Sequence, residues 1–283
     1  MPELPEVETI ARLLAPVLTG QTITRVEVLW ARTVDRPDPE AFCAALTGAR
    51  VTNVDRRGKY IQTALSTGQT VLTHLRMSGK FAVCRDGPGD DAPARGEKHA
   101  RLRWQLDDGA WVVYIDPRKF GRFYLVDDPR EITGDLGPEP LSADFTPQWL
   151  AAHLAQRRGE IKRLLLNQRF IAGLGNIYAS EALWQAGIHP QRIAGTLSAA
   201  EAERLHAAIV AALRAGLENG GTSLDGLYAY PSGGTGRHQE YLRVYDRAGE
   251  QCPRCGYAVE RIVQGQRSTY FCPVCQTQPV HEA

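Results

Sequence analysis

The pattern of hydrophobic and polar positions in residues 22–126 is typical of β-strands. Short runs in this stretch are rich in β-branched and aromatic residues, and turn signals such as Thr67-Gly68 and Asp107-Asp108-Gly109 separate them. Short strands at this spacing predict an antiparallel β-sandwich or barrel. The Gly-, Pro- and Asp-rich segment 85–96 is expected to be a mobile loop within it.

A helix is predicted immediately before this sheet. Val7, Ile10 and Leu14 recur at helical spacing, and Pro5 suits a first helical turn. The period becomes helical again after the Pro-rich stretch 127–147, which has the composition of a hinge. The further helices that we expect span residues 39–47, 147–155, 160–167, 176–186 and 198–217.

Composition narrows the class of protein but leaves the partner open. The 283 residues are 43% hydrophobic and 23% charged, as in a folded protein with an ample core, and the formal net charge is only +1. No apolar run approaches the ~20 residues that span a bilayer, and the first ten residues lack the basic segment of a signal peptide. We therefore expect a cytoplasmic protein that does not bind membranes. We also expect a monomer.

Four cysteines near the end of the sequence have the spacing of a metal site. The pairs Cys252-x2-Cys255 and Cys272-x2-Cys275 lie 16 residues apart, and the segment between them alternates as a hairpin would. A redox pair or free thiols are the alternatives. Four thiolates leave no open coordination position, so we predict one structural Zn²⁺ ion in a zinc ribbon.

These patterns predict an α+β protein of two domains: an N-terminal antiparallel β-sandwich with flanking helices and a C-terminal helical domain that ends in a zinc-ribbon hairpin. The boundaries expected are 1–128 for the sandwich, 129–145 for the hinge linker, 146–240 for the helical domain with a Gly/Ser-rich loop at 219–240, and 241–283 for the zinc ribbon.

The first residues combine groups that suit covalent chemistry on a sugar. Removal of Met1 would expose the secondary amine of Pro2, and an α-amine titrates near ~7.7–8.0, well below lysine. Attack of this amine on an aldehyde-level carbon gives a cationic iminium, which acts as an electron sink. Glu3 and Glu6 flank the amine and are candidates for proton transfer. The alternative is structural, because acids are favoured in a first helical turn and proline is a common second residue.

Several motifs together resemble the bacterial formamidopyrimidine-DNA glycosylases, a family of 8-oxoguanine repair enzymes. The matching segments are MPELPEVETI at the N-terminus, RRGKY at 56–60, HLRMSG at 74–79, DPRKFG at 116–121, LGPEPL at 136–141, GLGNIYASEALWQAGIHP at 173–190 and GQRSTYFCPVCQ at 265–276. The likeness covers almost the whole chain. It implies a DNA glycosylase/AP lyase of base excision repair whose helical domain holds a helix–two-turns–helix motif, with DNA bound between the two domains.

The resemblance also implies catalytic roles for matching residues. Pro2 would attack C1′ and form the Schiff base, and Glu3 would protonate the deoxyribose ring oxygen. Lys59 would serve in β-elimination and Arg267, at the expected hairpin tip, in δ-elimination. Glu6 matches a carboxylate held near the site. The expected partner is double-stranded DNA that contains an oxidised purine or an abasic site.

DNA contacts are implied in the same way. Met77, Arg118 and Phe120 match a trio that fills the gap left by the flipped base, with the guanidinium facing the orphaned cytosine. The residues that match further DNA contacts are His99, Arg158, Lys162 and Asn176. In one place the sequence departs from the family pattern: Gly236-Arg237-His238 replaces a Gly-Tyr-Phe-like element, which leaves the lesion preference open.

Three other functions remain as alternatives. An endonuclease VIII-like glycosylase would act on oxidised pyrimidines, although the PELPE start and the Met/Arg/Phe trio argue against it. A non-catalytic damaged-DNA-binding module would not need Pro2, Glu3, Lys59 and Arg267. A zinc-ribbon RNA-binding protein would leave the N-terminal run unexplained.

Overall fold

The computed structural model describes residues 1–84, 98–224 and 228–278. The chain divides into two compact units: Met1–Asp135 with Leu217–Gln239, and Leu136–Gly216 with Glu240–Ala283. The loop expected at 85–96 lies outside the described residues. The segment 219–240, which sequence analysis assigned to the helical domain, groups almost entirely with the first unit.

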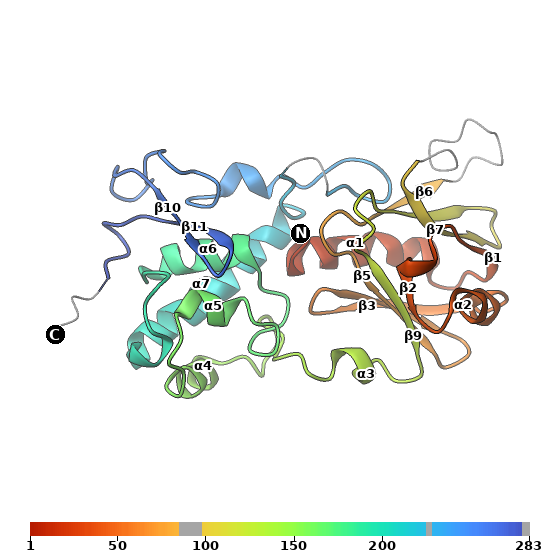
Figure 1. Ribbon diagram of the computed structural model, residues 1–283, viewed down its shortest axis with the longest axis horizontal. Helices are drawn as coiled ribbons and strands as arrows, with labels where there is room; N and C mark the ends of the chain where they lie inside the picture. The colour runs from red at the N-terminus through yellow and green to blue at the C-terminus, as the bar shows by residue number, and fades with distance from the viewer. Residues whose placement is uncertain (85–97, 225–227, 279–283) are drawn as a thin grey trace. The chain divides into compact units, whose positions relative to one another are not determined.

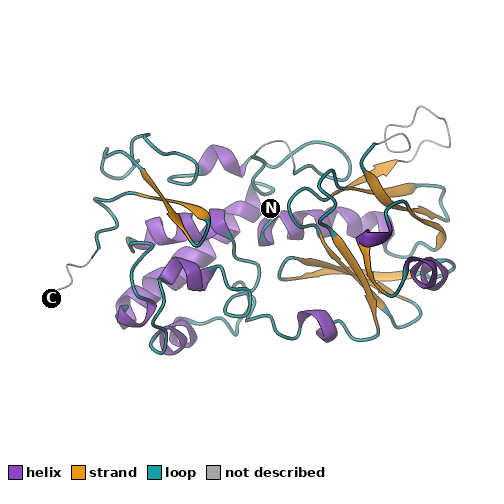
Figure 2. Cartoon of the chain, in the orientation of Figure 1, coloured by secondary structure: helices purple, strands orange, loops and turns teal. Residues whose placement is uncertain are grey.

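The first unit contains two β-sheets that form the layers of a sandwich (Figures 1 and 2). One sheet has the strand order β2-β9-β5-β4-β3, and the other has the order β1-β7-β8-β6. All pairings are antiparallel except that of β2 with β9, which is parallel. The strands are β1 (Ile23–Val28), β2 (Val34–Arg36), β3 (Val51–Arg57), β4 (Tyr60–Leu65), β5 (Thr70–His74), β6 (Lys80–Cys84), β7 (Ala100–Leu106), β8 (Trp111–Ile115) and β9 (Arg122–Val126).

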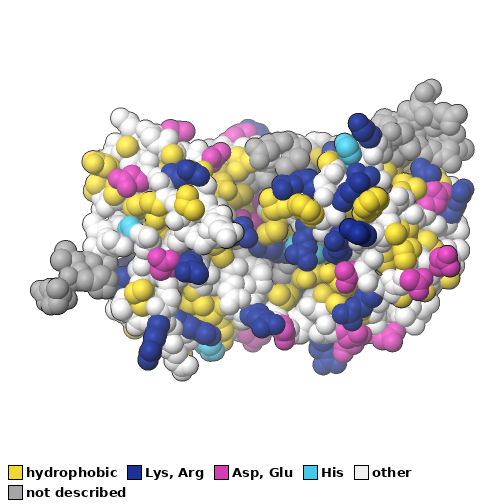
Figure 3. All heavy atoms as spheres, in the orientation of Figure 1, with side chains coloured by type: hydrophobic (Ala, Val, Ile, Leu, Met, Phe, Trp, Pro, Cys, Tyr) yellow, Lys and Arg dark blue, Asp and Glu magenta, His cyan; other side chains and the backbone are white. Residues whose placement is uncertain are grey.

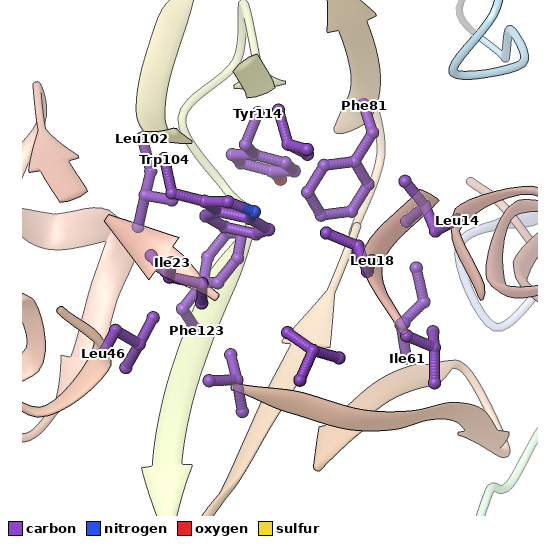
Figure 4. Packing of buried hydrophobic residues seen from close by; sticks show 14 of the residues in the cluster. Leu14, Leu18, Ile23, Leu46, Ile61, Phe81, Leu102, Trp104, Tyr114 and Phe123 are labelled. Carbon is purple, nitrogen blue, oxygen red and sulfur yellow. The ribbon is translucent and has the colours of Figure 1, made fainter. Parts of the chain in front are cut away.

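Aromatic side chains from both sheets fill the space between the layers (Figure 4). The ring of Phe123 lies 4.8 Å from that of Tyr114 and 6.3 Å from those of Phe81 and Trp104, in edge-to-face contacts. Strand β7 buries every second residue, as its sequence alternation predicts. The central strands β5 and β8 are buried on both faces.

Short helices flank the sandwich. The first helix, α1 (Leu4–Leu18), buries Ile10, Leu14 and Leu18 in the same core as the two sheets, which confirms the predicted apolar stripe. The other helices of this unit are η1 (Ala31–Thr33), α2 (Pro39–Leu46) and α3 (Arg130–Thr133). Helix α3 lies inside the stretch expected to be a hinge linker, so that stretch is not wholly irregular.

The second unit is helical and carries a two-stranded hairpin. Its elements are α4 (Pro147–Leu154), α5 (Ile161–Leu165), α6 (Asn176–Ala186), η2 (Ala194–Thr196), α7 (Ala199–Glu218), η3 (His238–Tyr241, which starts in the first unit), β10 (Glu260–Gln264) and β11 (Arg267–Phe271). Helix α7 buries Leu205, Ile209, Ala212 and Leu213, the stripe seen in the sequence. Among the described residues, no helix combines the length and apolar character needed to cross a membrane.

Candidate active site and nucleic-acid interface

The N-terminal residues are packed tightly at the start of α1. Pro2 is buried, whereas Met1 before it is 39% exposed. Glu3 is the N-cap residue and forms a capping box with Glu6, in which the backbone N–H of Glu3 donates to Glu6 Oε2 at 2.7 Å. Both carboxylates are buried, at 3% and 1% exposure. The two acids therefore hold the backbone that follows Pro2 in a defined conformation.

Glu6 also contacts the segment Leu217–Gln239, which is distant in sequence. Its Oε1 accepts the backbone N–H of Thr222 at 2.8 Å. Gly221 adopts φ +86°, and a Cβ there would lie 3.0 Å from Glu6 Cγ, so the close approach needs a glycine. The hydroxyls of Tyr228 and Tyr230 both donate to the Gly220 carbonyl, at 3.0 and 3.2 Å. The Gly-rich loop is therefore ordered around Glu6 over its described residues.

Lys59 occupies the two-residue turn that joins β3 to β4. Gly58 precedes it with φ +57°, which suits the first central position of a type II′ hairpin turn. Arg56 in β3 donates to Glu8 of α1 at 2.8 Å and to the Gly58 carbonyl at 3.0 Å, so the hairpin is tied to the N-terminal helix. Lys59 itself is only 5% exposed. The structure thus brings the hairpin that carries Lys59 against the helix that follows Pro2 and Glu3.

Sequence reasoning did not single out His74, although it belongs to the HLRMSG motif. It is 7% exposed, and its Nδ1 accepts the backbone N–H of Arg76 at 3.0 Å. Burial, with the positive charges of Arg76 and Lys59, lowers the pKa of His74 to about 3. The side chain is therefore neutral at physiological pH and acts as a hydrogen-bonded support beside Lys59.

The trio Met77, Arg118 and Phe120 lies on two loops of the first unit. Met77 is half-buried between β5 and β6, whereas Arg118 and Phe120 are exposed between β8 and β9. The Arg118 guanidinium lies 5.1 Å from the Phe120 ring, in a cation–π contact. On the face shown in Figure 3, Lys and Arg side chains of this unit lie beside exposed hydrophobic ones. His99, just before β7, is half-buried with Nδ1 3.3 Å from Arg101 Nη2.

In the second unit, Asn176 and Arg267 lie close to the same strand. Asn176 is the first residue of α6 and follows Gly173, which has φ +80°. Its Nδ2 donates to the carbonyl of Ser268 at 2.9 Å, so the helix start is joined to β11. Arg267 is exposed and begins β11 after the turn Gly265-Gln266, whose φ values of 55° and 63° are those of a type I′ hairpin. A helix N-terminus such as that of α6 favours negative charge and suits a phosphate.

Lys162 differs from the expectation of a DNA contact. It is 1% exposed, and its Nζ donates to Ser180 Oγ and Thr269 Oγ1, each at 2.9 Å. The side chain therefore joins α5, α6 and β11 in the interior of the unit. Arg158 is exposed, as a phosphate contact requires, and lies in the loop before α5.

The four cysteines of the C-terminal motif converge on one point. Their Sγ atoms all lie within 4.8 Å of one another, with Cys252 and Cys275 3.9 Å apart and Cys255 and Cys272 3.4 Å apart. Zn–S bonds of ~2.3 Å in a tetrahedron place the sulfurs about 3.8 Å apart, so the geometry fits a four-thiolate Zn²⁺ site. With this fit, Zn²⁺ would join the two turns of the ribbon and have a structural role.

A buried carboxylate that sequence reasoning missed supports this ribbon. Glu181 of α6 accepts the backbone N–H groups of Arg243, Val244 and Tyr245 at 2.8–3.0 Å. Burial raises the pKa of Glu181 despite these three hydrogen bonds. Val244 packs in the same apolar cluster as Cys252 and Cys272. Glu181 thus attaches the start of the ribbon to the helix that begins at Asn176.

Comparison with known families accounts for this combination of parts. The model of the formamidopyrimidine-DNA glycosylase N-terminal domain matches residues 1–123, and that of the formamidopyrimidine-DNA glycosylase H2TH domain matches 136–226. A zinc finger found in FPG and IleRS matches residues 249–278. Three such matches in this order define a DNA glycosylase with a helix–two-turns–helix domain and a zinc finger.

Relatives agree with this class over the full length. The chain is 47% identical over 283 residues to formamidopyrimidine-DNA glycosylase of Symbiobacterium thermophilum, and the alignment covers 99% of this chain and 90% of that protein. Identity to the protein of that name in Chloroflexus aggregans is 48%, over 98% of each chain. The structure of Lactococcus lactis Fpg with DNA containing an abasic site matches with a TM-score of 0.89 at 36% identity, over 98% of this chain and 100% of that chain. The chain belongs to the formamidopyrimidine-DNA glycosylase family.

These findings confirm the resemblance drawn from the motifs and the predicted fold class. They also confirm the zinc prediction, since the zinc-finger match includes all four cysteines. The roles of individual residues remain predictions.

Proposed function

We propose that this protein is a bifunctional DNA glycosylase and AP lyase of base excision repair, which removes 8-oxoguanine and formamidopyrimidines and then cuts the strand. Solved relatives hold DNA with an abasic site, with Fapy-dG and with carbocyclic 8-oxo-G. The observation that carries the proposal is the buried Pro2 beside the Glu3–Glu6 capping box, in a chain nearly half identical to enzymes of that name.

In the glycosylase step, Pro2 acts as the nucleophile after Met1 has been removed. With Met1 attached its nitrogen is an amide and inert, and afterwards it is a secondary amine. The amine forms a bond to C1′, the N-glycosidic bond breaks, and its electron pair leaves with the damaged base, which takes up the proton that the proline nitrogen loses. Glu3 then donates a proton to the ring oxygen as the C1′–O4′ bond opens, which leaves a cationic iminium between proline and C1′.

The iminium makes strand cleavage accessible because it withdraws electrons from the sugar. Loss of a proton from C2′ expels the 3′ phosphate, and we assign Lys59 to this β-elimination. Loss of a proton from C4′ then expels the 5′ phosphate, and we assign Arg267 to this δ-elimination. Glu6 acts indirectly, since it holds the backbone of Glu3 and of Thr222.

The proposed partner is double-stranded DNA in which the damaged base has left the stack. Met77 and Phe120 would fill the vacated space, and Arg118 would face the opposing cytosine. Asn176, Arg158 and His99 are assigned to the sugar–phosphate backbone. We place this activity in the bacterial cytoplasm, at the nucleoid during repair.

Strand cleavage on defined duplexes tests the proposal. Protein whose mass shows that Met1 is absent is incubated with duplexes that carry 8-oxoguanine or an oxidised pyrimidine at the same position, each opposite its normal pairing partner. We expect 8-oxoguanine to be excised faster, leaving phosphate at both new ends. Preference for the pyrimidine would indicate an endonuclease VIII-like enzyme, and binding without cleavage would indicate a damage-binding protein.

A further inference from the structure

The two loops that display Met77, Arg118 and Phe120 share one buried acid. Asp116 directly follows β8, at the start of the loop that carries Arg118 and Phe120, and it is 1% exposed. Its Oδ1 accepts the Ser78 hydroxyl at 2.5 Å, which is a bond to the loop that carries Met77. A short hydrogen bond to an ionisable acid inside a protein is among the stronger polar contacts.

The same carboxylate also organises its own loop. Its Oδ1 accepts the backbone N–H of Arg118 at 3.2 Å, and its Oδ2 accepts that of Gly121 at 2.8 Å. The Arg118 N–H is also 3.4 Å from Ser78 Oγ, at the limit of a hydrogen bond. A single buried side chain thus fixes both ends of the segment on which Arg118 and Phe120 lie, and it joins this segment to Ser78.

Tyr114 packs against both loops at the same point. Its side chain is fully buried, and a Cβ added to Gly79 or to Gly121 would lie 2.1 or 1.6 Å from its hydroxyl oxygen. Each loop therefore needs glycine where it meets this ring, which explains the last residue of both HLRMSG and DPRKFG. Burial, with the nearby Asp116 carboxylate, raises the pKa of Tyr114, so the hydroxyl keeps its proton.

The backbone of Asp116 is fixed as firmly as its side chain. Its N–H donates to the His99 carbonyl at 2.9 Å, and its carbonyl accepts Arg101 Nε at 2.8 Å. Further along the loop, Lys119 has φ +61°, and its Nζ lies 3.9 Å from the centre of the Trp30 ring. The loop is thereby attached to β7 and to the segment after β1.

The exposed side chains contrast with this fixed base. Phe120 is 49% exposed and contacts the Arg118 guanidinium, while the polar groups beneath them are almost completely buried. We propose that Asp116 is a positioning residue, which joins the Met77 loop and the Arg118–Phe120 loop into one rigid body that enters duplex DNA already arranged. This inference rests on the proposed function. Asp116 itself would touch neither the DNA nor the reacting atoms.

Such a role predicts a defect that depends on the second DNA strand. A base must be replaced in the stack only when the lesion lies in a duplex, whereas the lyase step on an abasic site in a single strand needs no insertion. We would compare excision from an 8-oxoguanine:cytosine duplex with cleavage of a single-stranded abasic oligonucleotide, for the wild type and for Asp116→Asn and Ser78→Ala. Asp38→Asn is the matched control, because Asp38 also accepts two backbone N–H groups, at the exposed start of α2.

We expect Asp116→Asn to lower kcat/KM on the duplex by about tenfold or more, the effect of losing charge-assisted hydrogen bonds. Ser78→Ala, which removes one bond and no charge, should lower it less, and both variants should cleave the single strand within about twofold of wild type. A fluorescent cytosine analogue opposite the lesion should respond to wild-type binding and to Asp38→Asn, and much less to Asp116→Asn.

Equal losses on both substrates would show that Asp116 only stabilises the fold and would overturn the inference. An unchanged duplex rate and analogue signal in both variants would overturn it as well. If the wild type cleaves neither substrate, the proposed function itself has failed, and that outcome is separate from any difference among the variants.

Discussion

Glu6 Oε1 accepts the backbone N–H of Thr222 at 2.8 Å, across 216 positions of sequence. The other oxygen of the same carboxylate accepts the N–H of Glu3 at 2.7 Å. One buried side chain therefore joins the start of α1, where Pro2 and Glu3 lie, to the Gly-rich segment Leu217–Gln239. A shift of that segment would therefore move the carboxylate that also holds the backbone N–H of Glu3.

Replacement of Glu6 by glutamine should impair catalysis more than binding. The amide keeps one acceptor, but its NH2 group faces a backbone N–H, and a buried charge-assisted hydrogen bond is worth ~1.5–3 kcal/mol. We expect kcat to fall about tenfold or more, with duplex affinity nearly retained. Glu40→Gln is the control, since Glu40 is an exposed acid in the first turn of α2. Wild-type kcat in Glu6→Gln would contradict this role.

Lys162 and Arg158 should respond in opposite ways to substitution. Lys162→Met removes the bonds to Ser180 and Thr269, so the free energy of unfolding should fall by about 2 kcal/mol, while the salt dependence of DNA binding keeps its slope. Arg158→Ala should leave stability within about 0.5 kcal/mol and reduce the slope of log K against log[salt] by about one contact. DNA titrations at several salt concentrations measure the slope for each variant. A lower slope for Lys162→Met would support the predicted contact between Lys162 and DNA.

Loss of one zinc ligand should unfold the ribbon. Cys255→Ser leaves three thiolates, and metal binding supplies much of the folding free energy of such small sites. The purified variant should contain less than one zinc per chain and bind duplex DNA more weakly, because the Arg267 hairpin is no longer held. Full zinc content with wild-type affinity would refute a structural four-cysteine site.

His74 makes stability depend on pH in a predictable direction. Its folded pKa of about 3 lies below the ordinary value near 6.5, so the unfolded chain binds a proton that the folded chain does not. Its stabilising contribution is complete above pH ~6.5 and falls by up to about 1.4 kcal/mol per pH unit as the pH drops toward 3. His74→Asn, which keeps an acceptor for Arg76, should flatten the decline between pH 7 and 5. An identical pH profile in urea unfolding would contradict the lowered pKa, because it would show that His74 titrates alike in the folded and unfolded chains.

Local patterns predicted the parts of this protein that depend on neighbours in sequence. The α1 stripe, the alternation of β7 and the paired CxxC motifs needed only short-range periodicity or spacing. Helix α3 was missed because its four residues lie among prolines and glycines that suggest a linker.

Local patterns of this kind did not predict the contacts between segments that are distant in sequence. Lys162 has the sequence environment of a surface cation, and only the packing of β11 against α6 shows that it is buried. Asp116 and Glu6 hold partners 38 and 216 positions away, and no local pattern distinguishes such acids from exposed ones. The grouping of Leu217–Gln239 with the first unit has the same cause.

The central claim is that Pro2 forms a covalent bond with damaged DNA. Protein that starts at Pro2 is incubated with an 8-oxoguanine:cytosine duplex and borohydride, and the adduct is mapped by mass spectrometry. The account predicts a reduced Schiff base on the N-terminal peptide, at Pro2, and none in Pro2→Gly under the same conditions. An adduct on a lysine, or none from protein that binds and cleaves the duplex, would contradict it.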